Sequence, residues 1–290
     1  MKLSALSAIV LVTSSAQITH AAELLPATVT AWNAYIEKAG SQAQERASGR
    51  LPFFWMNESA DRAARVGRGE VVVAPATGHG SEAVPNGLIH DWIGAIFIPG
   101  ASLDRVWALA HDYKNYPHMY RPAVASSKEL ACTGDRRELQ MVWQHKVLFV
   151  SAAMQGRYQV HDVRLDAHRG VSVADAVEMR EIERYGHADQ RLLPPGTGNG
   201  FIWRIRSIAR YEERDGGVYM ELEVMALTRD IPASVAWLVN PVVNRLSINS
   251  LTTTLRQTRD ALLSTQGPAE SLASSSFPVR ASLARKADRQ

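Results

Sequence analysis

Apolar residues recur at steps of three and four near the beginning and near the end of the 290-residue chain. This period predicts amphipathic helices over residues 24–50 and 240–263. Two shorter helices are predicted after Ser59 and Ser102, because a serine hydroxyl can accept a hydrogen bond from the free N–H groups of a first helical turn. The first long helix presents Leu25, Val29, Trp32, Ile36 and Ala39 on one side, and the second presents Ile248, Leu251, Leu255, Thr258 and Leu262.

Between the long helices the chain alternates between apolar and polar residues, which is the period of a β-strand. Turn signals such as TGD and LDAHRG separate the alternating runs. Strands are predicted at 70–76, 88–98, 123–131, 136–144, 147–161, 171–183, 201–213 and 218–228.

One hairpin can be predicted residue by residue. With Asp215-Gly216 at the turn, Arg210 lies directly opposite Glu221. One face of the two strands is then apolar, with Ser207 among its members. The other face is charged, and we expect it to face water, as in a half-buried antiparallel sheet.

The order of the predicted elements is one strand, two helices, a run of antiparallel strands and one long helix, which is an α+β pattern. We expect a curved antiparallel sheet that grips the C-terminal helix over residues 88–263. Residues 22–87 precede it as an N-terminal helical extension and linker, with a boundary loop at 77–87. The Ser/Ala-rich residues 264–290 are expected to be disordered.

Composition and charge narrow the functional classes. The chain is 46% hydrophobic and 21% charged, with a net charge of +3, which is ordinary for a globular protein. Its arginines are scattered, so no basic stripe indicates nucleic-acid binding. Weak peripheral attraction to an anionic membrane stays open. Cys132 is the single cysteine, and we expect a structural thiol there.

The first 21 residues are typical of a signal peptide. Lys2 precedes an apolar run over 3–12, and Thr19 and Ala21 occupy positions −3 and −1 of a cleavage site. We therefore expect export to the periplasm or the medium, with a mature chain that begins near Ala22. The apolar run is too short to span a bilayer, and no later segment is apolar enough.

The candidate chemistry is sparse. Three His-Asp pairs, at 90–91, 111–112 and 161–162, lack the spacing of metal ligands, so no metal site is expected. No nucleophile elbow and no cofactor fingerprint occurs. Asp175 alternates with valines, and if that face is inward, burial would raise its pKa and make it a weak catalytic candidate. In the alternative, its neighbours Ala174 and Ala176 face inward and Asp175 is solvated.

Three stretches resemble the START/Bet v1-like (SRPBCC) superfamily with its helix-grip fold. They are GAIFIPGASLDRVWALAHDYKNYPHMYRP at 94–122, GFIWRIRSIARYEERDGG at 200–217 and VYMELEVMALTRDIPASVAWLVNP at 218–241. The resemblance covers about 88–263 and implies an internal cavity for lipids, sterols, polyketides or other hydrophobic molecules. It also implies that the connection 233–239 forms a lid over the cavity mouth.

The residues expected to contact the ligand come from the predicted inward faces and from the lid. Some of them belong to a second hairpin, predicted to turn at His145-Lys146; large apolar residues there are equally consistent with an ordinary core. The ligand-binding candidates are Trp143, Met154, Tyr158, Asp175, Trp203, Ser207, Val224, Trp237 and Leu238.

The resemblance and the composition together favour an exported protein that binds or carries a hydrophobic small molecule or lipid, without a cofactor. The alternative is a polyketide cyclase or lyase that uses the same cavity, with Asp175 as acid or base. A third reading is an interior filled by its own side chains, with the function on the surface.

Overall fold

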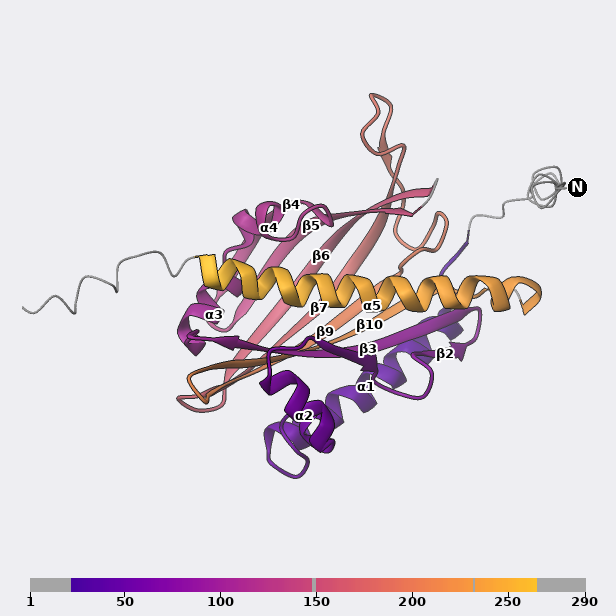
Figure 1. Cartoon of the computed structure of the whole chain (residues 1–290). Helices are drawn as coiled ribbons and strands as arrows, with labels where there is room; N and C mark the ends of the chain where they lie inside the picture. The colour runs from indigo at the N-terminus through magenta and orange to yellow at the C-terminus, as the bar shows by residue number, and fades with distance from the viewer. Residues whose placement is uncertain (1–21, 148–149, 232, 265–290) are drawn as a thin grey trace, which may run out of the picture.

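The computed structural model describes residues 22–147, 150–231 and 233–264. Within them, ten strands form one antiparallel sheet that curves around a single long helix, α5 (Ala233–Ser264) (Figure 1). The α+β architecture predicted from the sequence, a curved sheet that grips a C-terminal helix, is confirmed. We call the sheet face toward α5 the inner face and the opposite face the outer face.

The sheet is continuous from edge to edge in the order β1-β3-β10-β9-β7-β6-β5-β4, while β2 pairs with β3 and β8 pairs with β7. The strands are β1 (Val72–Pro75), β2 (Ser81–Val84), β3 (Gly87–Pro99), β4 (Val124–Thr133), β5 (Arg136–Val147), β6 (Val150–Arg164), β7 (Arg169–Glu183), β8 (Arg191–Leu192), β9 (Arg204–Arg214) and β10 (Gly217–Arg229). The remaining helices are α1 (Pro26–Ala47), α2 (Ala60–Gly67), α3 (Leu103–Ala110) and α4 (Tyr116–Met119), with 3₁₀ turns η2 (Trp55–Glu58) and η3 (Tyr113–Asn115).

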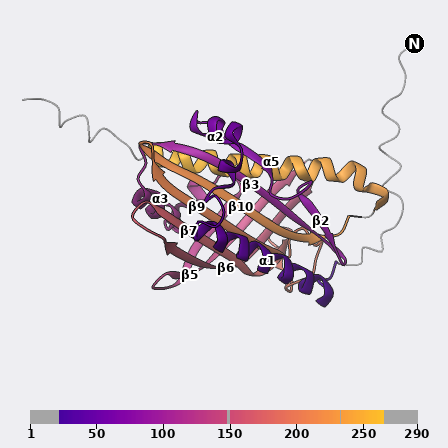
Figure 2. The same cartoon turned by 90° about the horizontal axis from the view of Figure 1, so that it is seen from below.

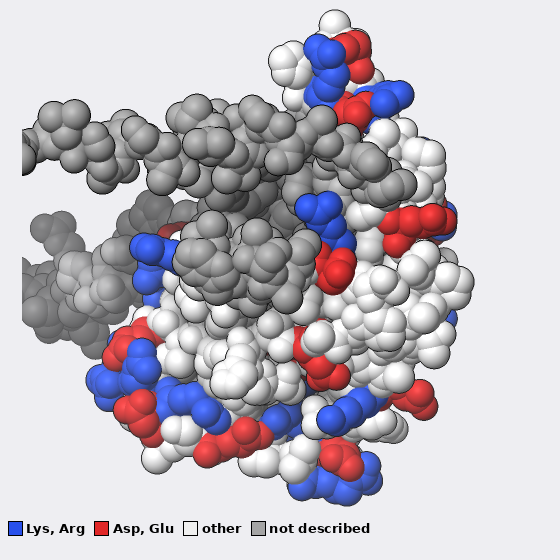
Figure 3. Space-filling view, turned by 90° about the vertical axis from the view of Figure 1, so that its right-hand side faces the viewer, with Lys and Arg blue, Asp and Glu red and all other residues white. Residues whose placement is uncertain are grey.

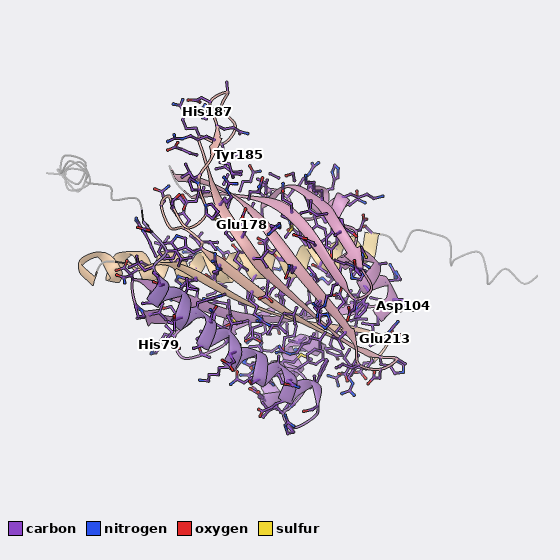
Figure 4. All side chains as sticks on the ribbon, turned by 180° about the vertical axis from the view of Figure 1, so that it is seen from behind. His79, Asp104, Glu178, Tyr185, His187 and Glu213 are labelled. Carbon is purple, nitrogen blue, oxygen red and sulfur yellow. The ribbon has the colours of Figure 1, made fainter. Side chains whose placement is uncertain are left out.

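The predicted helix caps are present. The Ser59 hydroxyl accepts a hydrogen bond from the N–H of Arg62 at the start of α2. The Ser102 hydroxyl does the same for Arg105 in α3, where the carboxylate of Glu213 on β9 also accepts from the N–H of Leu103 at 2.7 Å. Figure 4 shows Glu213 and Asp104 at this end of the molecule. These bonds satisfy donors that a helix leaves free at its N-terminus.

The C-terminal helix begins earlier than predicted. Residues 233–239, expected to be a connection over the cavity mouth, are the first turns of α5. Pro241 is the source of the error, because a proline usually marks the first turn of a helix. Here it lies inside the helix. The expected lid is therefore a helical segment that continues the grip helix.

The hairpin β9–β10 has the predicted register, with Arg210 opposite Glu221 and Gly217 opposite Arg214. The hairpin β5–β6 does not turn at His145-Lys146. Val147 still pairs with Val150, so β5 is longer than predicted and β6 begins and ends three residues later. The alternation in this hairpin is correct, but its register shifts, and Trp143 faces Met154 instead of residue 148.

The N-terminal extension belongs to the same fold. Its strands β1 and β2 pair with β3, so the predicted boundary loop at 77–87 contains a strand of the sheet. Helix α1 crosses the outer face while α5 lies on the inner face, as Figure 2 shows from below. In α1, Trp32 and Ala39 pack against Ile208 and Met225 of the outer face.

The charged face of β9 and β10 is buried beneath this extension. Arg210 and Glu221, which are 2% and 0% exposed, are joined by an ion pair of 3.1 Å, and Arg210 also contacts Glu223 at 3.2 Å. The second oxygen of Glu221 accepts a hydrogen bond from the N–H of Met56 in η2. The prediction that this face is solvated is wrong, because alternation shows which residues share a face but not which distant segment covers it.

Candidate functional site

The inner face is less completely covered than the outer face along the same strand. On β10, Leu222, Val224 and Ala226 point inward and keep partly exposed surface. Their outward neighbours Met225 and Leu227 are fully buried under α1. Apolar side chains that face an interior helix should be the better covered set in a filled core. This part of the inner face of β10 is therefore less completely covered than the outer face behind it.

Among the side chains of α5 that the structure describes, those buried against the sheet lie in the C-terminal half of the helix. Leu251, Leu255 and Leu262 are buried in the core that contains Trp92 and Ile96 of β3. Gly94 allows this contact, because a Cβ at that position would lie 2.8 Å from Leu255 Cδ1.

Nearer its N-terminal end, the same helix leaves apolar side chains uncovered. Val242 and Ile248 of α5 are exposed. Figure 3 looks at the end of the molecule where α5 begins, and white surface there is interspersed with charged side chains. We call this end, where Val242 and Ile248 are exposed, the open end of the grip.

A cluster of large side chains lines the inner face between β5, β6 and β7. Trp143, Met154 and Tyr158, all predicted ligand contacts, pack here with Met179. The indole Nε1 of Trp143 donates to the Tyr158 hydroxyl at 2.7 Å. Burial raises the pKa of Tyr158, so the phenol stays protonated in the physiological range. Of these side chains, Trp143 keeps partly exposed surface on the inner face.

Ser207 and Val224 are direct partners on β9 and β10, and both lie on the inner face with partial exposure. His90 of β3 is on the same face, where its Nε2 lies 3.1 Å from the Thr228 hydroxyl. Its Nδ1 is buried without a hydrogen-bond partner among the described residues. Burial lowers the pKa of His90, which favours the neutral imidazole.

The closed end of the interior lies under α3 and α4 and is aromatic. The rings of Tyr113, Tyr116 and Tyr120 follow one another edge to face, at centroid distances of 5.3 and 5.0 Å. Tyr116 and Tyr120 keep partly exposed surface, yet burial raises the pKa of both hydroxyls. The two hydroxyls are therefore buried, and the partly exposed surface belongs to the rest of each side chain.

An ion pair stands beside these tyrosines. Nε2 of His111 lies 2.9 Å from Oδ2 of Asp162, and the guanidinium of Arg137 is 3.9 Å from the same oxygen. Burial raises the pKa of Asp162, but hydrogen bonds from His111 and Ser172 outweigh it and hold the pKa below its ordinary value. The carboxylate is therefore ionised and already paired.

Two predicted site residues lie on the other face. Asp175 pairs with Arg206 on the outer face, where their side chains are 3.5 Å apart and the carboxylate is 44% exposed. Burial raises its pKa and Arg206 lowers it, with a net rise. The Asp175 carboxylate therefore does not face the interior. Its neighbours Ala174 and Ala176 lie on the inner face instead.

Trp203 also packs outward, against Trp32 and Leu227, instead of into the interior. Strand β9 begins at Arg204, so the alternation used to place Trp203 does not extend to it, and Ile202 joins the inner cluster in its place. The side chains of Trp237 and Leu238 lie outside the described residues. The cluster of Tyr113, Tyr116 and Tyr120 was not predicted as part of the site, although the stretch DYKNYPHMY at 112–120 contains all three.

Glu181 holds the loop beside the open end. Its carboxylate, 5% exposed, accepts hydrogen bonds from the N–H groups of Asn199 and Phe201 and from the Asn199 amide. The turn after β7 projects beyond the sheet, with Tyr185 and His187 near its tip (Figure 4).

Within the described residues, no group of three or more His, Cys, Asp or Glu side chains could hold a metal ion. No helix in the same ranges is long and apolar enough to cross a membrane. A solvent-open depression of about 470 Å³ lies between α2 and the end of α5, with Arg68 and Arg259 on its rim. It is on the surface at the closed end and away from the inner face.

The chain matches no protein-family model, and no curated protein matches it in sequence. Solved structures of similar shape include a STAR-related lipid transfer protein from Xanthomonas axonopodis, with 16% identity and a TM-score of 0.42, covering 67% of this chain and 98% of that chain. Human STARD10 matches with 8% identity and a TM-score of 0.41, covering 66% and 78%. The Zhui aromatase/cyclase from Streptomyces sp. R1128 matches with 12% identity and a TM-score of 0.41, covering 63% and 98%. At these values the likeness transfers neither ligand nor activity, and the helix-grip assignment rests on the strand order and the place of α5.

Proposed function

We propose that this chain is an exported protein that binds or carries a hydrophobic small molecule or lipid between the inner face and α5. The observation that carries the proposal is the partial exposure of Leu222, Val224 and Ala226 beneath an interior helix. Covering such surface with a ligand would stabilise the complex by roughly 25 cal/mol for each Å² of apolar area removed from water. The signal-peptide pattern of residues 1–21 supports the export.

The enzymatic alternative, a polyketide cyclase or lyase, has lost its main candidate. Asp175 was its acid or base, and it lies on the face opposite the interior. The ionised and paired Asp162 is not poised to exchange a proton near neutral pH. The binding function therefore has the stronger support.

The first test is mass spectrometry of the purified protein, native and after solvent extraction. We expect a hydrophobic passenger, or uptake of an added fluorescent apolar probe at one molecule per chain. A protein that is empty and takes up no fatty acid, sterol or apolar probe would contradict the proposal.

A variant that fills the interior locates the site. Val224→Trp places an indole at the partly exposed inner face. We expect probe affinity to fall at least about tenfold, while the free energy of unfolding changes by less than the roughly 1–3 kcal/mol that overpacking a filled core costs. The matched control is Val163→Trp, at an exposed valine of β6. If Val224→Trp instead destabilises the protein by that larger amount, the interior is filled.

A further inference from the structure

Tyr211 of β9 lies next to the aromatic cluster, on the side of α5. Among the described residues, no group accepts the proton of its hydroxyl. Tyr116 donates to the carbonyl of Ala110 at 2.5 Å. The Thr258 hydroxyl donates to the carbonyl of Thr254, so at the 3.1 Å contact between Tyr120 and Thr258 the phenol must be the donor. No described residue accepts the Tyr211 proton, although the side chain is only 4% exposed.

The hydroxyl oxygen of Tyr211 is not among the fully buried side-chain atoms without a partner, so it keeps some accessible surface. Burial raises the pKa of Tyr211 strongly, so the phenol stays protonated and can donate a hydrogen bond. Desolvated donors are nearly always paired in folded proteins, and an orphan one costs free energy unless a ligand or water pairs with it.

A floor of small residues leads from the open region to this hydroxyl. Across β7 and β9 the inner-face pairs are Ala174 with Ser207, Ser172 with Ala209, and Gly170 with Tyr211. Beyond them the ring of Trp107 packs against Gly170, where a Cβ would lie 2.6 Å away, and closes the floor. Four residues of a strand span about 13 Å, which is the depth from Ser207 to Tyr211.

The charges nearby select a neutral partner. The ionised Asp162 acts on the Tyr211 hydroxyl, and the side chains of His111 and Arg137 are directed at that carboxylate. An anionic headgroup would meet repulsion from the Asp162 carboxylate. A ketone, ester carbonyl or alcohol oxygen accepts the phenol proton without adding charge.

We propose that Tyr211 binds a neutral oxygen at the buried end of an otherwise apolar ligand, such as the carbonyl of a ketone. This inference rests on the proposed function, because it assigns one end of the ligand that the interior would hold. It also sets a direction of entry, with the oxygenated end leading toward the closed end and the apolar remainder along Ala174 and Ser207.

The test compares two probes that differ only in one carbonyl, 6-propionyl-2-(dimethylamino)naphthalene and 6-propyl-2-(dimethylamino)naphthalene, on the full chain. Tyr211→Phe removes the donor and keeps the ring. We expect it to weaken binding of the ketone by about 3- to 10-fold, the range of one neutral hydrogen bond, and to leave binding of the propyl compound unchanged. Tyr113→Phe is the control, because it also removes a hydroxyl without a described partner, beside Arg137 and Glu129.

The outcomes separate the two proposals. If Tyr211→Phe binds both probes as the wild type does, the oxygen site is contradicted and the hydrophobic site stands. If the wild type binds neither probe, both proposals fail. Should Tyr211→Phe not fold, the infrared carbonyl stretch of the ketone bound to the wild type decides. We expect it below its frequency in an apolar solvent, and a stretch at that frequency overturns the inference.

Discussion

Asp91 links its own protonation to the contact between β3 and helix α1 of the N-terminal extension. It is 3% exposed on the outer face, and its Oδ2 accepts a hydrogen bond from the Tyr35 hydroxyl of α1 at 2.7 Å. Burial raises its pKa to about 7, with a further rise from Glu223, against the lowering effects of Tyr35 and Arg210. Arg210 forms ion pairs with Glu221 and Glu223 and also acts on Asp91, so holding a proton on Asp91 limits the repulsion among these three carboxyl groups.

Stability should therefore fall as pH rises through neutrality. The unfolded chain loses the Asp91 proton near pH 3.8 and the folded protein near pH 7, so the folded state binds more protons between these values. The contribution is complete below pH 4 and is lost as pH passes 7, by up to roughly 4 kcal/mol at about 1.4 kcal/mol for each pH unit. Urea unfolding from pH 5 to pH 8 measures the slope.

The control for this slope is Asp91→Asn, which cannot titrate. His90, whose pKa is lowered by burial, acts in the opposite direction at lower pH and is present in both proteins. The difference between the two profiles therefore isolates Asp91. An equally steep fall in Asp91→Asn would assign the effect to another group.

At the scale of elements, the grip of α5 depends on Gly94. A Cβ on Gly94 would lie 2.8 Å from Leu255 and 3.0 Å from Val73, both part of the packed core. We expect Gly94→Ala to lower the free energy of unfolding by about 1–2 kcal/mol, because the helix must move away from β3. Thermal and urea unfolding measure the change.

Gly40→Ala is the matched substitution with the opposite expectation. Gly40 lies inside α1, and a Cβ there meets nothing within 4 Å. Alanine in a helix interior should raise the free energy of unfolding by roughly 0.5–1 kcal/mol. Gly94→Ala that is neutral or stabilising would mean that α5 does not close on β3 as tightly as the contact indicates.

The elements that sequence could predict are those specified locally. Asp215-Gly216 determines the register of β9–β10 because a two-residue turn fixes which residues face each other. The start of α5 was predicted too late, because a proline such as Pro241 commonly lies in the first turn of a helix. Trp203 was placed on the wrong face, because its strand begins only at the next residue, Arg204. A one-residue change reverses the face of a side chain.

The candidate site was predicted in part for the same reason. Trp143, Met154, Tyr158, Ser207 and Val224 lie on the inner face because they sit within regular strands. The sequence left the face of Asp175 open, because its run of valines suits either side of the sheet, and the alternative with Ala174 and Ala176 inward is the one observed. Only the cover supplied by α1, more than 100 residues away along the chain, decides which side is apolar.

For the whole molecule, the extension acts as a required cover of the sheet. Phe54 and Met56 pack on Ile93 and Tyr219, and without them Glu221 and Arg210 would lie on an exposed, largely apolar face. We expect a chain that begins at Val71 to be insoluble or to bind 1-anilinonaphthalene-8-sulfonate strongly, as measured by sedimentation and fluorescence. Adding residues 22–70 as a separate peptide should reverse this. A monomeric, stable fragment would show that the cover is dispensable.

The strand order also determines when the protein can fold. Strand β3 ends at Pro99, but its partner β10 is complete only when the chain has been made to Arg229. Arg210, the buried partner of Glu221, lies in the β9–β10 hairpin and is therefore also made late. Pairing of such distant segments makes folding slow. Nothing that precedes β10 can close the sheet, so the nascent chain stays open through most of its synthesis. For the export proposed above, this topology would keep the chain unfolded until most of it has been made.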